Sequence, residues 1–541
     1  MSQTLRAFMS TRGAAALVLT GVLLVYGALY AQTRQFAFVW TDRAAVVDSE
    51  TFRRPLAEQL RTTDHTRLDP NLARLEGVAL MHDSYRPLVL LSHNVDIRLF
   101  GDRPGPMHVH SVLLGALAIL GAFWLAWRTL GSASQGLLVA AIFAFHPLQA
   151  EAICFVSARA DPLSGVLGLA AAGLVAEGAA RGGRAKTGAM IGAGVLTFLS
   201  LCAKEAVALL PVGVACLALA RGRRREWAGG ILAMLAAVPV YVVLRALLAR
   251  GAAVQTRTVL DAITHVPAAC VEYAVTFFFP LDISIARPLY VTRAVGWLVL
   301  GGLVVLVVVL LRRPPAQWKA RFGLAAAGAG WVGLLLAPST VAVLSERAVA
   351  DRYAYLSVFG FALTTVVLGT WLADRRPGLR RVMQGAAGVF LAICVVITAS
   401  EIPAWKSHQA LVEHAIQVEP LRSANHRRLG HMLAAQGQWP AAVESFEKAA
   451  ALADATDREL NDLGVGYMNV GRVPDAERMV RRAIERSGGL NFQAWYNLGT
   501  TRRLQGDPRG ACESYRRALL LSPNYRRASA DHAAHCAGYA P

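Results

Sequence analysis

Apolar runs long enough to cross a membrane recur through most of this chain, and they constrain its fold more than any other feature. They begin near residue 12, continue to about residue 399 and then stop. A membrane-spanning helix needs about 20 mostly apolar residues, and repeated spans must satisfy their backbone hydrogen bonds within helices. Hydrophobic residues make up 55% of the chain and charged residues only 17%, which excludes a disordered chain and argues against a purely soluble one. The sequence therefore predicts an all-α, polytopic membrane domain over residues 1–400.

Eleven spans are expected from these runs. The first, 13–30, follows Arg6 and Arg12 and lacks a good cleavage site, so it is predicted to remain as an uncleaved helix. The segment 262–279 reads equally as a span or a re-entrant helix, so the count lies between ten and twelve. The other expected spans are 109–128, 133–148, 161–179, 187–202, 205–220, 228–249, 294–311, 322–338, 354–373 and 382–399.

The net charge of +19 would suggest nucleic-acid binding in a soluble protein, but the positions of the basic residues indicate membrane topology instead. Lys and Arg concentrate in cytoplasmic loops, and with eleven spans the four basic segments fall on one side. The N-terminus is then cytoplasmic, while the large loop 31–107 and the C-terminus lie outside, and no nucleic-acid partner is expected. A helix at the membrane surface is expected within 85–101. The four basic segments are 181–186, 221–226, 312–321 and 374–381.

The remaining residues, 401–541, are polar and repetitive. The dipeptide Leu-Gly recurs at 429, 463 and 498, and Gly437, Gly471 and Gly506 follow the same period. This period of 34 or 35 residues, with small residues at fixed positions, is typical of tetratricopeptide repeats, whose stacked helix pairs form a concave groove. Three repeats are predicted, at 423–455, 457–490 and 492–525. Cys512 and Cys536 lie here, and either a disulfide in an oxidising compartment or two free thiols is compatible with the sequence.

Polar clusters at the predicted span ends are the candidates for chemistry, because ionisable groups near the membrane are costly to bury. Asp42 could act as a general base on a hydroxyl or could cap a surface helix. The other clusters have structural alternatives too, such as anchoring at the interface or a loop ion pair, and His146 could be a hydrogen-bonding residue before proline. These other clusters contain Arg86, then His146 with Arg159 and Asp161, then Lys204 with Glu205, and finally Arg352 with Tyr353.

Several kinds of chemistry find no support in the sequence. It contains no P-loop, no GxGxxG after a strand, no HExxH, no GxSxG and no CxxC. Soluble nucleotide chemistry and a cysteine metal site are therefore not expected. Periodic charges within consecutive spans, as in an ion pathway, are also missing, which argues against a transporter.

The ordered clusters resemble the transmembrane and tetratricopeptide-repeat-containing O-mannosyltransferases and their bacterial relatives in the GT-C superfamily. The resemblance rests on FVWTDRAAVVDSE, YRPLVLLSHNVDIRLFG, FAFHPLQAEAICFVSARAD, LCAKEAVALLP and DRYAYLSVFGFAL, followed by the repeats. It implies an inverting transfer of a sugar, with mannose as the first guess, from a polyprenyl-phosphate donor to a hydroxyl of a polypeptide. Asp42 matches the essential acid. The donor would contact Arg352, Arg159, Lys204, Asp161, Tyr353, Arg86, His146 and Glu205.

The chain also departs from the pattern of this family. Thr41 stands where a second acid is usual, so no metal ligand set is expected, no cofactor is obligatory and a divalent metal has little support. Ser111 and Gly115 stand where an asparagine and a second histidine are usual. These departures favour an alternative, a non-catalytic scaffold that recruits partners through its repeats. A lipid-linked glycan ligase is a further alternative, and the composition, rich in Ala, Gly and Arg, suggests a bacterial inner membrane.

Overall fold

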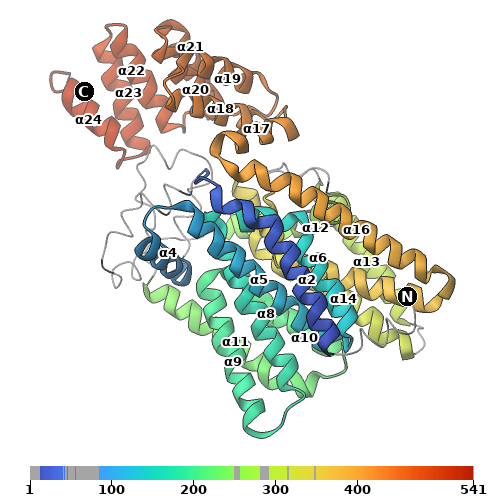
Figure 1. The fold of residues 1–541 in the computed structure, drawn as a ribbon. Coiled ribbons are helices and arrows are strands. Elements are labelled where there is room, and N and C mark those ends of the chain that lie inside the picture. Colours follow the sequence, from blue (N-terminus) through green and yellow to red (C-terminus); the bar gives the residue numbers. More distant parts are fainter. Residues whose placement is uncertain are drawn as a thin grey trace. The chain divides into compact units, whose positions relative to one another are not determined.

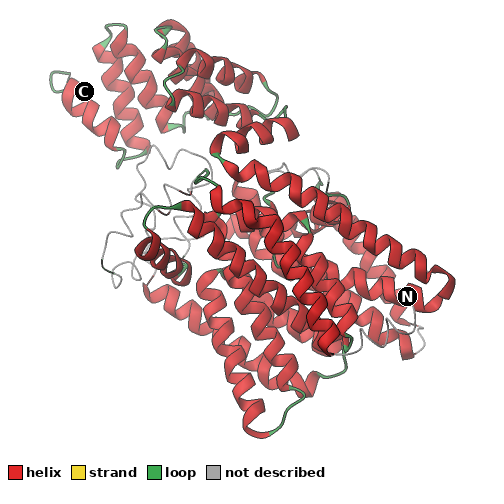
Figure 2. Ribbon diagram, in the orientation of Figure 1, coloured by secondary structure: helices red, strands yellow, loops and turns green. Residues whose placement is uncertain are grey.

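The computed structural model describes residues 12–40, 42, 46, 55, 85–248, 256–280, 291–312, 316–346 and 349–539. Within these ranges the regular elements are helices and no strand occurs (Figure 2). The predicted all-α class is therefore confirmed. The chain divides into two compact units, Met1–His408 and Gln409–Pro541.

Long helices build the first unit. The helices α2, α5, α6 and α8 pack side by side (Figure 1). A shorter helix, α4, is set at an angle beside the start of α5. The α-helices of this unit are α2 (Arg12–Tyr30), α4 (Pro87–Phe100), α5 (Pro104–Leu130), α6 (Ala133–Phe145), α7 (Ala150–Cys154), α8 (Ala160–Gly178), α9 (Gly183–Ala203), α10 (Leu210–Ala220), α11 (Arg224–Leu248), α12 (Thr256–Phe278), α13 (Arg293–Arg312), α14 (Ala316–Glu346), α15 (Ser357–Arg375) and α16 (Arg380–Glu401).

Within the described residues, eight helices are long and apolar enough to cross a membrane, or nine if the bent pair Ala133–Phe145 and Pro147–Cys154 forms one span. This pair bends by 60°, at a proline that cannot continue the helical hydrogen bonding. Two further apolar helices, Glu205–Ala220 and Ile263–Phe278, are short. The predicted count of eleven is therefore not confirmed. The ambiguous segment 262–279 forms most of α12, which contains Pro267.

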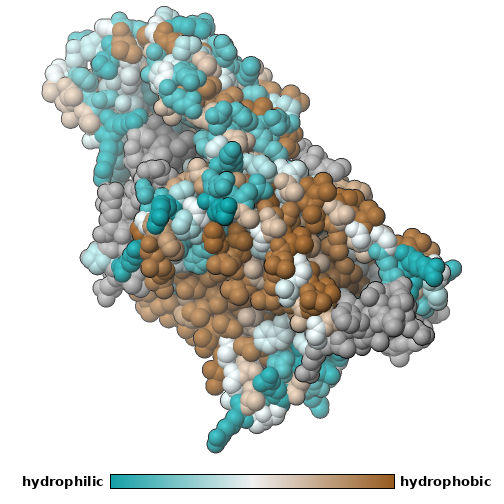
Figure 3. All heavy atoms as spheres, in the orientation of Figure 1, coloured by the Kyte–Doolittle hydropathy of each residue, from teal (hydrophilic) through white to brown (hydrophobic). Residues whose placement is uncertain are grey.

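The outer surface of these helices suits a lipid environment. Large apolar side chains such as Leu17, Leu24 and Leu298 are more than half exposed, at 64%, 69% and 75%. Figure 3 shows the resulting hydrophobic surface over the long helices, with hydrophilic residues gathered toward their ends. In water this surface would be unstable, whereas lipid tails cover it at no cost.

Helix direction places the polar clusters at one end of this unit. The helices α8 and α9 are joined by a short turn at 179–182 and pack against each other, so the start of α8 lies near the end of α9. Three of the basic segments, 181–186, 221–226 and 374–381, come at the opposite helix ends. Close approach at the polar end requires glycine, because a Cβ atom on Gly165 would lie 2.7 Å from a ring carbon of Tyr355.

The second unit contains three helix hairpins that coincide with the predicted repeats. They are α18 (Ser423–Ala435) with α19 (Trp439–Ala451), α20 (Asp457–Asn469) with α21 (Val473–Arg486), and α22 (Phe492–Leu504) with α23 (Pro508–Leu521). The helix α17 (His408–Val418) precedes them and α24 (Arg526–His535) follows. Gly437, Gly471 and Gly506 have φ of +76°, +78° and +82° between paired helices, a conformation that favours glycine.

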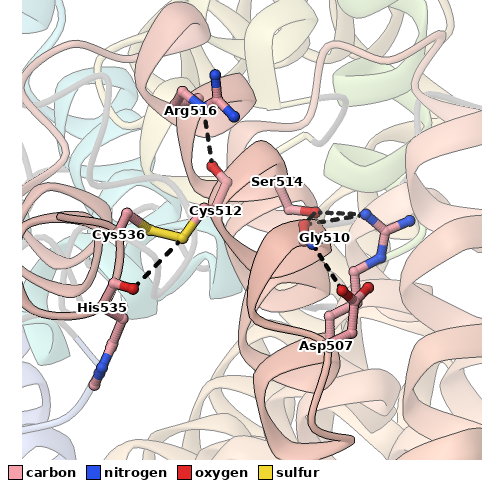
Figure 4. The surroundings of a disulfide bond; sticks show 8 residues. Asp507, Gly510, Cys512, Ser514, Arg516, His535 and Cys536 are labelled. Carbon is pink, nitrogen blue, oxygen red and sulfur yellow. Dashed lines mark hydrogen bonds between the residues drawn. A yellow bond between two sulfur atoms is a disulfide. The ribbon is translucent and has the colours of Figure 1, made fainter. Parts of the chain in front are cut away.

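The repeated Leu-Gly pair has a packing reason. A Cβ atom on Gly430 would lie 2.4 Å from a ring carbon of Phe446, so only glycine allows α18 to approach α19 this closely. In the last hairpin, Cys512 of α23 forms a disulfide with Cys536, which follows α24 (Figure 4). Of the two alternatives left open by the sequence, the structure has the bridge, and the other five cysteines are free.

Candidate functional site

Asp42 lies buried just after the first long helix. One carboxylate oxygen accepts hydrogen bonds from the backbone N–H and the hydroxyl of Ser157, both at 2.7 Å, and the other accepts from the backbone N–H of Val39 at 3.3 Å. Burial raises the pKa of Asp42 to about 6, although these hydrogen bonds oppose the shift. The side chain thereby ties the first loop to the segment that precedes α8.

The loop around Asp42 also carries an aromatic residue in an unusual conformation. Trp40 has a φ of +49°, a backbone region that non-glycine residues rarely adopt and that often accompanies functional sites. Its ring stacks on Phe155, with the ring centroids 5.6 Å apart. Phe155 in turn packs against Trp405 at 5.8 Å, so an aromatic group borders Asp42.

Arg352 lies over this aromatic group. Its guanidinium carbon is 6.0 Å from the ring centroids of Trp40 and Phe155 and 4.8 Å from that of Tyr353. Its guanidinium also forms an ion pair with Glu151, which accepts a second hydrogen bond from the Arg352 backbone N–H at 2.9 Å. Arg352, which precedes α15, and Glu151 of α7 are thus held together beside the loop that contains Trp40.

Lys204 and Asp161 form a second buried ion pair, between the end of α9 and the start of α8. The Lys204 Nζ also lies 5.5 Å from the centre of the Tyr353 ring. The adjacent Glu205 takes a different partner, Arg86, through two parallel hydrogen bonds of 3.0 Å. This bidentate geometry fixes the start of α4 against the turn before α10.

Arg159 has no exposed surface, and its partner Asp96 is also buried. The guanidinium contacts the Asp96 carboxylate at 2.5 Å and donates to the backbone oxygen of Met107 at 3.0 Å. The Asp96 carboxylate also contacts the Nδ1 atom of His110 at 2.9 Å. Arg159 is therefore committed to the α4–α5 side of the unit and does not line the cavity beside Lys204.

His146 lies apart from these ion pairs. It is fully buried at the bend between α6 and α7, where its Nδ1 accepts from the backbone N–H of Leu148 at 3.2 Å. Its Nε2 lies 2.9 Å from the backbone oxygen of Phe277, and its ring stacks on that residue at 4.6 Å. These contacts give His146 a structural role at the bend, which is the alternative that the sequence also allowed.

The Lys204–Asp161 ion pair borders a small cavity. It has a volume of about 10 Å³, the space of one water molecule, and Asp161, Lys204, Tyr353 and Ser339 contribute to its lining. A phosphate or a sugar could enter only if the ion pairs separated. The chemistry available at this place is a set of paired cations suited to an anionic group, next to an aromatic surface and a buried acid.

The structure brings together most of the predicted site residues and adds others. Arg86, Asp161, Lys204, Glu205, Arg352 and Tyr353 form one connected network, whereas Arg159 and His146 point elsewhere. The added residues are Trp40, Glu151 and Ser157, whereas Asp96 belongs with Arg159 on the α4–α5 side. Asp96 and Glu151 had a detectable signal, since each is an acid within a mostly apolar run, but their basic partners are 63 and 201 positions away.

No metal-binding group emerges among the described residues. There, no three side chains of His, Cys, Asp or Glu come together to hold an ion. Thr41, the position of the missing second acid, lies outside the described residues. The sequence expectation that no cofactor is obligatory stays a prediction.

Comparison with known proteins gives one result for the repeats and one for the chain as a whole. The tetratricopeptide repeat family matches residues 492–525 and 426–462. A solved structure, the crystal structure of the APC/C hetero-tetramer Cut9–Hcn1, covers 88% of this chain and 100% of its own. Its TM-score of 0.26 and sequence identity of 13% are too low to bear on fold or function.

The chain also matches curated relatives over part of its length. It is 34% identical over 140 residues to the protein O-mannosyl-transferase Tmtc1 of Drosophila melanogaster, covering 25% of this chain and 15% of that protein. It is 32% identical over 165 residues to the TMTC1 proteins of Homo sapiens and Mus musculus, covering 29% of this chain and 17% and 16% of theirs. The match therefore spans about a sixth of the length of these relatives. This membrane protein, which carries tetratricopeptide repeats, is therefore similar in sequence to part of the protein O-mannosyl-transferases.

Proposed function

We propose that this protein is an inverting glycosyltransferase that moves a sugar, with mannose as the first candidate, from a polyprenyl-phosphate donor to a hydroxyl of a polypeptide. The observation that carries the proposal is the convergence of Arg86, Lys204 and Arg352 at one end of the helical unit, each paired with an acid. The similarity to protein O-mannosyl-transferases supports the same activity.

The paired charges suit the binding of a lipid-linked phosphate. Buried cations are costly unless an acid or another anion neutralises them, so Glu151 and Asp161 fill that role while no donor is bound. A donor phosphate would exchange with these carboxylates and leave each cation paired. As the bond to the anomeric carbon breaks, Arg352 and Lys204 would stabilise the charge that develops on the polyprenyl phosphate.

Asp42 is the proposed base of this reaction. The acceptor oxygen would attack the anomeric carbon from the face opposite the phosphate and form the new glycosidic bond. Its proton would pass to the Asp42 carboxylate, and polyprenyl phosphate would leave with the electrons of the broken bond. A pKa of about 6 suits this step, because the carboxylate is charged at neutral pH yet basic enough to accept a proton. Asp42 must become exposed to the acceptor, through displacement of its bonds to Ser157 or Val39.

Two features support an external location for the site and the repeats. The polar clusters lie at the helix ends opposite three of the basic segments, which the positive-inside rule assigns to the cytoplasm. The Cys512–Cys536 disulfide in the repeat unit suits an oxidising compartment. We propose that the repeats hold a polypeptide acceptor on this outer side, in a bacterial inner membrane.

The experiment is a sugar-transfer assay with the purified full chain in nanodiscs. Labelled polyprenyl-phosphate mannose and an extract of envelope proteins are supplied, and transfer to protein is measured for the wild type, Arg352→Gln and Arg375→Gln. Arg352 pairs with Glu151 at the site, whereas Arg375 is an exposed arginine over Trp371 at the opposite helix end. Transfer should fall at least about tenfold in Arg352→Gln, since a hydrogen bond to a charged group is lost, and stay unchanged in Arg375→Gln.

Three results would contradict this proposal. Equal transfer by both variants would show that Arg352 does not contact the donor. The absence of transfer by the folded wild type with mannose and other lipid-linked sugars would favour the scaffold. Transfer to added lipid or polysaccharide rather than protein would identify a glycan ligase.

A further inference from the structure

An open pocket of about 710 Å³ lies between α4 and α5, away from the cavity beside Lys204. These two helices are joined by residues 101–103 only, and Gly101 adopts a φ of +66° in that turn. The pocket is therefore the groove of a tight helix hairpin. The proposed sugar transfer makes no use of it.

Most of the pocket wall is apolar and faces outward. Val95 and Leu99 of α4 and Val109 and Leu113 of α5 line the pocket, and Leu99 and Leu113 are 66% and 58% exposed. On each helix the spacing of four residues puts the pair on one face, so two apolar rows border the groove. The hydrophobic surface over α4 and α5 is visible in Figure 3. Apolar rows this exposed, on helices that border a membrane, suit the hydrocarbon chains of a lipid.

The polar part of the pocket contains two groups that can bind an anion. Arg34, which follows α2, is exposed and lines the pocket, and so does His110 of α5. A Cβ atom on Gly105 would lie 2.4 Å from the backbone oxygen of Arg34, so glycine at this position allows the Arg34 segment to approach α5. The close packing of the Arg34 segment on α5 thereby places Arg34 beside the groove.

The orientation of the His110 ring is fixed by its contact with Asp96. Its Nδ1 atom contacts the Asp96 carboxylate at 2.9 Å, and the other oxygen of that carboxylate is held by Arg159, so Nε2 is the nitrogen left for a ligand. Asp96 does not repel an incoming anion, because the fully buried Arg159 neutralises it.

We propose that the groove between α4 and α5 binds an anionic phospholipid, with its phosphate between Arg34 and His110 and its acyl chains along the two apolar rows. The Arg34 guanidinium next to an apolar groove fits a lipid that carries a net negative headgroup, rather than a neutral one. The lipid would fasten α4 to α5 from the membrane side, while the Arg86–Glu205 pair fastens the other end of α4. This inference does not depend on sugar transfer.

The test is lipid retention by the purified full chain, measured by native mass spectrometry. Detergent-solubilised protein is titrated with phosphatidylglycerol or with phosphatidylcholine of identical acyl chains. Phosphatidylglycerol should be retained at a concentration about tenfold lower, and Arg34→Gln and His110→Gln should each remove most of this preference, since a charge-assisted contact is lost. Arg98→Gln is the matched control, because Arg98 is an exposed arginine of α4 that does not line the pocket.

A second pair of variants tests the apolar rows. Leu113→Trp should block the groove and weaken retention of either lipid, whereas Leu117→Trp, one turn further along α5, should not. Arg34→Gln changes an exposed side chain, so it keeps the test decisive if a change at His110 prevents folding. Equal retention of the two lipids by the wild type would overturn the proposal. Displacement of phosphatidylglycerol by stoichiometric polyprenyl phosphate would overturn it as well, and would assign the groove to an isoprenoid phosphate.

Discussion

At the scale of single residues, the site is a set of charges whose partners come from distant parts of the chain. Arg86 and Glu205 are 119 positions apart, Asp161 and Lys204 are 43 apart, and Arg352 lies 201 from Glu151. Each pair joins two helix ends, so removing one member would leave a buried or half-buried charge alone. The pairs therefore support the fold of this end while keeping cations available for an anionic ligand.

The charge state of Asp42 should control the rate of transfer. Burial raises the pKa of Asp42 to about 6, and only its deprotonated form accepts a proton. The rate should therefore rise between pH 5 and pH 7, with a midpoint at about 6, and level off above it. Asp42→Asn keeps an oxygen for Ser157 but cannot act as a base, so the rate should fall by about 10²- to 10⁴-fold at neutral pH.

The control for this prediction is Asp374→Asn, which changes an exposed acid paired with Arg321 at the opposite helix end. It should leave both the rate and the pH profile unchanged. Transfer measured across this pH range for the three proteins checks the prediction. A pH profile that is the same in the wild type and Asp42→Asn would remove Asp42 from the role of base.

At the scale of elements, the candidate residues lie on short 3-10 turns that lead into longer helices. Arg159 ends the turn Val156–Arg159 before α8, Glu205 begins the turn Glu205–Leu209 before α10, and Arg352 lies in Asp351–Ala354 before α15. Such turns have weaker hydrogen bonds than an α-helix and often mark functional positions. We therefore expect the ion pairs to separate through changes in these turns while the long helices stay in place.

A helix cap in the repeat unit offers a direct test of local stability. Thr456 forms a capping box with Glu459 at the start of α20, and its backbone N–H donates to the Glu459 carboxylate at 2.8 Å. Thr456→Ala should destabilise this hairpin by about 1 kcal/mol, because a backbone donor at the helix start loses its partner. Hydrogen exchange of residues 457–486 in the full chain should then accelerate about fivefold.

The control for the cap is Arg458→Ala, which shortens an exposed side chain in the first turn of the same helix. Arginine and alanine are both good helix formers, so this change should leave the exchange of residues 457–486 nearly as it is in the wild type. An equal effect of both variants would contradict the role of the cap.

The repeats and most long helices could be predicted from the sequence, because periodicity and long apolar runs are local signals. The helix expected within 85–101 is present as α4, which begins at Pro87. The bend at Pro147 and the short helix Glu205–Ala220 were less predictable, since apolar content alone does not reveal where a helix breaks. The partners within the site were beyond sequence reasoning, because the pairing of Lys204 with Asp161 rather than Glu205 depends on how α8 packs against α9.

At the scale of the whole molecule, the two units differ in what they present to their surroundings. The first exposes apolar helices and gathers its charges at helix ends, whereas the second is a polar stack of hairpins closed by a disulfide. A membrane enzyme that modifies polypeptides would benefit from both, one unit for a lipid-linked donor and the other for the acceptor.

The oxidation state of Cys512 and Cys536 in the cell reports on which side of the membrane the repeats lie. Alkylation of the unreduced full chain, isolated from native membranes, should label only the free cysteines, of which there are five. Cys512 and Cys536 should react only after reduction, because the outer compartment favours the bridge. Mass spectrometry of the labelled peptides gives the result. Free reaction of both thiols without reduction would place the repeats in the cytoplasm and contradict the proposed topology.

Gly115 illustrates how two positions of this protein depend on each other. A Cβ atom there would lie 2.0 Å from the hydroxyl oxygen of Tyr26, whose hydroxyl donates to the backbone oxygen of Val112. A larger residue at position 115, including the histidine usual in the resembled family, therefore requires the Tyr26 hydroxyl to move. The two positions are therefore coupled: a side chain added at 115 is accommodated more easily where residue 26 is smaller than tyrosine, for example phenylalanine, which lacks the hydroxyl.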